Sequence, residues 1–108
     1  MKKEVEEKIN QLQIMEMNLQ NILLQKRTMQ IQLLEVDNAI KELKNSKEDA
    51  YKVIGSIMVK TERDKLIKEL DSKKEMVEIR LKSMDKQEKE IMEHASKMQQ
   101  EIIKESKQ

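Results

Sequence analysis

Two stretches of this 108-residue chain, residues 3–46 and 62–105, contain neither proline nor glycine, the residues that most often interrupt a helix. In both, apolar residues recur at alternating steps of three and four, which places them along one side of a helix. Each helix would be ~65 Å long at ~1.5 Å per residue. We call these two sets of residues the seams. The first seam is Val5, Lys8, Leu12, Met15, Leu19, Ile22, Lys26, Met29, Leu33, Val36, Ile40 and Leu43; the second is Ile67, Leu70, Lys74, Val77, Leu81, Met84, Glu88, Ile91, Ala95, Met98 and Ile102.

The two seams match each other if the chain folds back at its middle. Leu43 then faces Ile67, and the residue numbers of every facing pair add up to 110, so one register holds along both stretches. The charged residues Lys26 and Glu88 fall in adjacent layers, where contact between them would ease the burial of both. The pattern predicts a mainly α fold, a long antiparallel two-helix coiled coil within one chain. The alternative is two independent helices in a larger oligomeric bundle.

Composition excludes several classes of function. Charged residues make up 40% of the chain and aromatic residues 1%, so a thick globular core is not expected. Lys and Arg (22) balance Asp and Glu (21), which gives no bulk attraction to nucleic acid or membrane. No stretch approaches the ~20 apolar residues of a membrane span, and the N-terminus lacks the apolar core of a signal peptide. The absence of cysteine fits a reducing compartment. We expect a cytoplasmic protein that binds neither nucleic acid nor membrane.

The sequence also offers no catalytic or metal-binding constellation. The single glycine excludes a glycine-rich phosphate loop. His94 is the only histidine, and Ile91 replaces the glutamate of a helical Glu-x-x-His metal motif. We therefore expect no catalytic residue, no metal, no cofactor and no enzyme activity.

The connector "AYKVIGSIMVKT", residues 50–61, has the alternation of a strand pair around Gly55-Ser56 and predicts a β-hairpin over residues 51–60. A two-residue loop fits a turn with glycine first, whereas a three-residue loop puts Tyr51, Val53, Ile57 and Val59 on one face. The spacing leaves both registers open. Thr61, with Asp64 three residues later, is the expected N-cap of the second helix.

A two-stranded hairpin is at best marginal on its own, and it has two edges that can accept further strands. This one is apolar on both faces, and a thin coiled coil cannot cover it. We therefore expect the hairpin to assemble with other copies or other subunits into a sheet or closed barrel. The residues expected to carry assembly are Tyr51, Val53, Ile54, Gly55, Ile57, Met58 and Val59.

The connector and the following "KELDSKKEMVEIRLKSMDKQE" resemble the β-type subunit of the prefoldins, most closely the archaeal kind. The likeness covers essentially the whole chain as one domain, residues 1–108, with helix, hairpin and helix. It is most specific at Tyr51-Lys52, Gly55 and Val59-Lys60, and the run at residues 86–88 supports it. The α-type subunit would need two hairpins, and the connector has room for one.

The resemblance implies a hexamer of two α-type and four β-type subunits, in which hairpins form a β-barrel platform and coiled coils project from it. It implies an ATP-independent chaperone, a holdase that captures unfolded proteins at the coiled-coil tips and delivers them to a group II chaperonin.

Exposed, flexible apolar side chains suit the loose binding of many partners. Ile14, Met17 and Ile103 are off-seam near the chain ends, which the register brings together, and fraying would uncover seam residues beside them. The expected client-binding residues are Val5, Ile9, Leu12, Ile14, Met17, Met98, Ile102 and Ile103. The alternative function is a structural coiled-coil spacer or tether that its hairpin oligomerises. The chain alone indicates neither the client range nor whether it assembles without a partner subunit.

Overall fold

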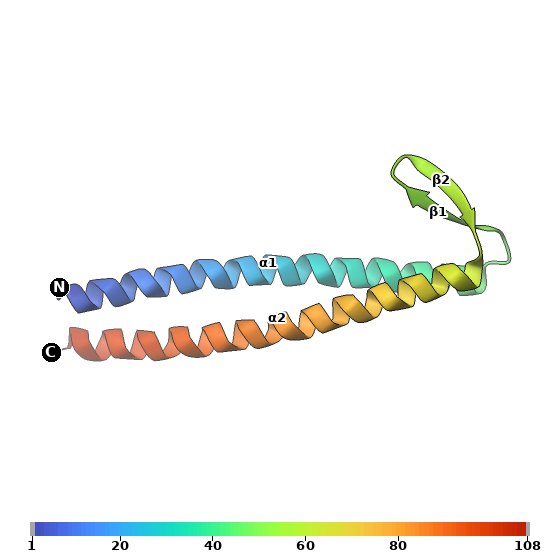
Figure 1. Cartoon of the computed structure of the whole chain (residues 1–108). Coiled ribbons are helices and arrows are strands. Elements are labelled where there is room, and N and C mark those ends of the chain that lie inside the picture. The colour runs from blue at the N-terminus through green and yellow to red at the C-terminus, as the bar shows by residue number, and fades with distance from the viewer. Residues whose placement is uncertain (1, 108) are drawn as a thin grey trace. The chain divides into compact units, whose positions relative to one another are not determined.

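The computed structural model describes residues 2–107 and contains four elements in the order helix, strand, strand, helix (Figure 1). Helix α1 spans Lys3–Asn45 and helix α2 spans Arg63–Ser106. Strands β1 (Ala50–Ile54) and β2 (Ile57–Thr61) form one two-stranded antiparallel sheet. No helix among the described residues is long and apolar enough to cross a membrane.

The chain divides into two compact units, which are described separately. The terminal unit comprises residues 1–27 and 82–108, and the hairpin unit comprises residues 28–81. Each unit contains part of α1 and part of α2, and in each the two helices are antiparallel.

The expected seams are the buried sides of the helices. Every seam position is buried or half-buried. In the hairpin unit, Val36, Ile40 and Val77 are buried. Val5 is the only buried residue among the described residues of the terminal unit. The terminal unit is thus held by a narrow line of partly covered side chains.

The predicted contact between Lys26 and Glu88 is confirmed, with 2.6 Å between the Lys26 Nζ and Glu88 Oε2 atoms. In the hairpin unit, Lys74 of the second seam lies 2.7 Å from Asp37. Charged seam residues are therefore compatible with the fold because each of these lysines reaches a carboxylate on the opposite helix.

The hairpin has a two-residue loop, since Ile54 pairs with Ile57. Gly55 has φ +60°, and no described residue other than glycine has positive φ. A positive φ at the first loop position only is the signature of a type II′ turn, which favours glycine there.

The structure decides the hairpin register that the sequence left open, and it corrects one sequence-based expectation. The two-residue loop does not put the four bulky residues on one face: Tyr51 and Val53 share a face with Met58, whereas Ile57 and Val59 share the other with Ile54. Thr61 is also not the N-cap of α2. It pairs with Ala50 in the sheet, and the carbonyl oxygen of Glu62 accepts the first helical hydrogen bond, from Leu66 N–H at 3.0 Å. Thr61 is therefore the last residue of β2, paired with β1, and does not cap α2.

Candidate functional site

The hairpin exposes apolar side chains on both of its faces. Val53 and Met58, paired across one face, are 66% and 67% exposed, and Ile54 and Ile57, paired across the other, are 57% and 65% exposed. Tyr51 and Val59 are exposed as well. Because clustered exposed apolar side chains often mark a binding site, the hairpin is a candidate association surface. All seven residues predicted for assembly lie on it.

Polar contacts tie the hairpin to its own unit. The Lys52 ammonium lies 2.8 Å from the Glu69 carboxylate on α2, and Lys60 lies 3.3 Å from Asp49. Arg63, the first residue of α2, donates a hydrogen bond from Nη2 to the carbonyl oxygen of Glu48. These contacts join each strand and the connector to neighbouring segments, so that the strand faces have a defined orientation within the hairpin unit.

The Lys52–Glu69 pair changes the pKa of Glu69. The hydrogen bond and positive charge of Lys52 hold the pKa of Glu69 below its ordinary value of 4.5. Both side chains are more than two-fifths exposed, so solvent weakens this interaction. We regard it as orienting the hairpin more than stabilising it.

The eight residues predicted to bind clients fall into two classes in the terminal unit. Ile14, Met17 and Ile103 are 57%, 65% and 56% exposed. The seam residues among them are covered, most of all Val5 at 3% exposure. The half-buried members are Ile9, Leu12, Met98 and Ile102. Three of the eight therefore expose more than half of their surface directly, and the others would expose most of theirs only if the helices separate.

Ion pairs hold the helices together in the terminal unit. Lys8, a seam residue, bonds to Glu105 and lies 3.6 Å from Glu101. Lys26 lies 2.6 Å from both Asp85 and Glu88. Hydrogen bonding to these carboxylates raises the pKa of both lysines above 10.5. The narrow seam thus relies on charged layers, whose contribution is sensitive to salt and pH.

Sequence reasoning missed several exposed apolar residues. On α1 these are Leu23 and Leu24 in the terminal unit and Ile31 and Leu34 in the hairpin unit; on α2 they are Met76, Ile79 and Met92. For most of the α1 residues, the sequence does contain a signal. They belong to a second set of apolar positions that lie outside the seam and follow one another at steps of three or seven residues. A coiled-coil repeat is defined by the dominant seam alone, so it assigns no role to apolar residues outside that seam.

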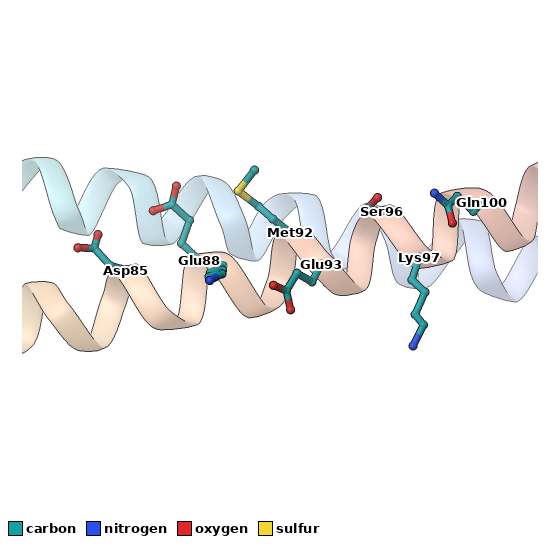
Figure 2. A pocket seen from close by; sticks show the side chains of 8 residues that line it. Asp85, Glu88, Met92, Glu93, Ser96, Lys97 and Gln100 are labelled. Carbon is teal, nitrogen blue, oxygen red and sulfur yellow. The ribbon is translucent and has the colours of Figure 1, made fainter.

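The terminal unit also has a groove along α2 of about 770 Å³. Figure 2 shows Glu88 and Met92 projecting to one side of α2 and Glu93 and Lys97 to the other. All its lining residues come from this one helix: Asp85, Glu88, Lys89, Met92, Glu93, Ser96, Lys97 and Gln100. A surface of interspersed charges on a single helix is most simply a solvated face. Among the described residues, no group of three or more His, Cys, Asp or Glu side chains is placed to hold a metal ion.

Comparison with known proteins agrees with this architecture. A family model described as prefoldin subunit matches residues 6–108. The prefoldin subunit beta of Thermococcus kodakarensis is 34% identical over 101 residues, covering 92% of this chain and 86% of the relative. That of Pyrobaculum calidifontis is 37% identical over 89 residues, covering 81% and 71%. The crystal structure of the prefoldin beta subunit from Thermococcus strain KS-1 superposes with a TM-score of 0.86 at 31% identity, covering 94% of this chain and 90% of the other. With a hairpin between two long helices and a family match over nearly its whole length, this chain belongs to the prefoldin subunit family.

Proposed function

We propose that this chain is the β-type subunit of a hexameric, ATP-independent holdase chaperone. It would act as a single domain, joining through its hairpin with two α-type and three further β-type subunits in the cytoplasm. The assembly would hold unfolded proteins at the ends of its coiled coils and pass them to a group II chaperonin. Family membership and the exposed apolar residues of the hairpin and the chain ends support this proposal.

The hairpin supports the assembly step. Its two faces expose six large apolar side chains, and each strand has one edge without a partner in the two-stranded sheet. Further strands can satisfy such edges by backbone hydrogen bonding, and packing removes the apolar faces from water. Association through the hairpin would therefore pair the free strand edges and cover the exposed apolar faces.

The observation that carries the holding function is the exposure of apolar side chains near the chain ends. Ile14, Met17 and Ile103 are all more than half exposed in the terminal unit. Burial of apolar area contributes ~25 cal/mol per Å², so a few side chains bind weakly. Several subunits on one platform raise the effective concentration and convert weak contacts into firm holding.

The test measures suppression of aggregation of guanidine-denatured citrate synthase by light scattering. Two variants alter the ends. Residues 1–12 are deleted at the N-terminal end in the first, and Ile102→Ser is combined with Ile103→Ser at the C-terminal end in the second. Both should weaken suppression while sedimentation shows an intact assembly. Ile79→Ser, an exposed position in the hairpin unit, serves as the matched control.

Full activity of both variants in an intact assembly would contradict binding at the ends. A wild-type assembly without any suppression would instead support the spacer or tether function.

A further inference from the structure

One segment of α1 is almost free of charge, although 40% of the residues of the whole chain are charged. Between Ile9 and Gln25 the only charged residue is Glu16. The remainder is apolar or carries a side-chain carboxamide. The carboxamide residues are Asn10, Gln11, Gln13, Asn18, Gln20, Asn21 and Gln25.

The helix geometry sorts these residues between two sides. Leu12, Leu19 and Ile22 lie on the covered seam. At ~100° per residue, Ile14, Met17 and Leu24 fall on the opposite side, and these side chains are 57%, 65% and 63% exposed.

Carboxamides surround these three side chains. Asn10, Gln13, Gln20, Asn21 and Gln25 fall on the same side of α1 and are all exposed. A shallow groove of about 350 Å³ lies at the end of this side farther from the N-terminus. It is lined by Gln20, Leu23, Leu24 and Arg27. We call the side formed by these five carboxamide residues with Ile14, Met17 and Leu24 the amide face.

Helix α2 has no equivalent among the described residues of the terminal unit. The same geometry places Lys86, Lys89, Glu93, Lys97 and Lys104 opposite its seam, and all are exposed. On the sides opposite their seams, the two helices thus present different chemistry to solvent: neutral and partly apolar on α1, densely charged on α2. Solubility alone does not require this difference, because charged residues would serve it equally well on both helices.

We propose that the amide face of α1 binds extended segments of non-native polypeptide that carry little charge. Apolar side chains of the segment pack against Ile14, Met17 and Leu24, while the surrounding carboxamides exchange hydrogen bonds with its backbone. The inference rests on the proposed holdase function and extends the client site from the chain ends along one flank of α1.

The chemistry of the face favours this occupant. A carboxamide offers both a donor and an acceptor, which matches the unpaired N–H and C=O groups that an unfolded chain exposes. This matching does not depend on the client's sequence. Glu16 is the only charged residue between residues 9 and 25, and Arg27 lies at the end of the face. The face therefore provides little charge complementarity for a folded, charged partner.

The size of the face also argues against a second copy of this chain. Specific protein interfaces bury ~1,200–2,000 Å² in total, more than three apolar side chains and their neighbours provide. A flexible segment that reaches the amide faces of several subunits at once overcomes this limit through effective concentration. Weak single contacts therefore suit an unfolded chain better than a rigid partner.

The first test introduces charge into the amide face. Met17→Lys with Leu24→Lys keeps two good helix formers on α1 and removes the apolar contacts. Met92→Lys is the control, since Met92 is 52% exposed on α2 within the same unit. With guanidine-denatured citrate synthase, the double variant should need about tenfold more protein for half-maximal suppression of light scattering. The control should match wild type, and sedimentation should show an intact assembly for both.

The second test addresses the carboxamides. The probe is a fluorescein-labelled peptide of alternating Leu and Gln, prepared with and without N-methyl groups on alternate backbone amides. Fluorescence anisotropy should show several-fold weaker binding for Gln13→Glu with Gln20→Glu than for the α2 control, Gln99→Glu with Gln100→Glu. N-methylation should weaken binding to wild type and control several-fold, and change binding to the amide-face variant little.

The outcomes separate the two proposals. Wild-type suppression by the Met17→Lys, Leu24→Lys variant, or equal peptide binding by the two Gln→Glu pairs, overturns the amide face. An assembly that binds the peptide in the predicted pattern but does not suppress aggregation supports the amide face and contradicts the holdase function.

Discussion

The Nζ atom of Lys26 lies 2.6 Å from Glu88 Oε2, joining residues that are 62 positions apart, and it lies equally close to Asp85 Oδ1. The Lys26 side chain is 18% exposed and that of Glu88 is 22% exposed. Two charges in adjacent layers of an apolar seam thus share one cross-helix contact. This relationship agrees with the register of the terminal unit, in which Lys26 and Glu88 lie one layer apart and the Lys26 side chain reaches Glu88 across the seam.

The charged layers should be less stabilising than apolar layers of the same size. Lys26→Met alone should lower the melting temperature, since it leaves Glu88 half-buried without its partner. Lys26→Met with Glu88→Leu should restore or exceed the wild-type melting temperature, because well-packed apolar residues often outperform a partly buried ion pair. Thermal unfolding followed by circular dichroism at 222 nm checks both. A double variant that melts below the single variant would contradict this assignment.

Helical stability should fall in alkaline solution. Carboxylates on the opposite helix raise the pKa of Lys8, Lys26 and Lys74 above 10.5. A lysine whose pKa is raised on folding contributes stability that is complete below 10.5 and is lost as pH rises through the folded-state value. The melting temperature should therefore decline from about pH 10 upward, by less in Lys26→Met than in wild type. An unchanged melting temperature over that range would argue against these pairs.

Acid should affect the hairpin's attachment through Glu69. Its pKa is lowered by Lys52, so the contribution of this pair is present above pH 4.5 and is lost as pH falls through the lower folded-state value. The effect should be small because both groups are substantially exposed. Glu69→Gln should remove this part of the acid dependence of assembly, measured by sedimentation between pH 5 and pH 3, whereas Glu75→Gln should not.

The two hairpin faces can be tested separately because the two-residue loop assigns each residue to one of them. Val53→Asp places a charge on the Tyr51 and Met58 face, and Ile57→Asp on the Ile54 and Val59 face. Where a face is buried in the assembly, the charge should cost several kcal/mol and yield smaller species in sedimentation, with helical circular dichroism retained. Ile79→Asp, on an exposed position of α2, is the control. If neither hairpin variant dissociates the assembly, the hairpin does not control it.

The turn should tolerate few replacements of Gly55. Its φ is +60°, and a Cβ atom at this position would meet nothing within 4 Å beyond its chain neighbours, so a substitution meets backbone strain and no steric clash. Gly55→Val should destabilise the hairpin by ~1–2 kcal/mol, while Gly55→Asn should cost less because asparagine tolerates this region. Assembly measured against protein concentration should weaken more for valine than for asparagine. Equal behaviour of the two variants would contradict a glycine-dependent turn.

Client holding should need neither metal nor nucleotide. The chain has one glycine, too few for a phosphate loop, and residues 2–107 place no group of three or more metal-binding side chains together. Adding EDTA or ATP should leave suppression of citrate synthase aggregation unchanged. A dependence on either would require a site that these residues do not explain.

The sequence determined the seams and their register. Burial along a coiled coil follows the local repeat of three and four residues, so positions such as Val36 and Val77 could be assigned without coordinates. Once the chain folds back, complementarity of the two seams also fixes which residues face each other, and the Lys26–Glu88 contact followed from it. The hairpin could also be predicted from the sequence, because Gly55-Ser56 lies between two strand-like runs.

Only the tertiary structure decided how the remaining residues are used. Both hairpin registers satisfy the local alternation, and hydrogen bonding between β1 and β2 selects the one that pairs Ile54 with Ile57. That pairing takes Thr61 into the sheet, although its local sequence favours an N-cap. Val5 is 3% exposed whereas Leu12, on the same seam, is half-buried, and this difference depends on how closely the opposite helix packs. Local pattern specifies which surfaces a chain can bury, but the partner that covers a surface is set by segments distant in sequence.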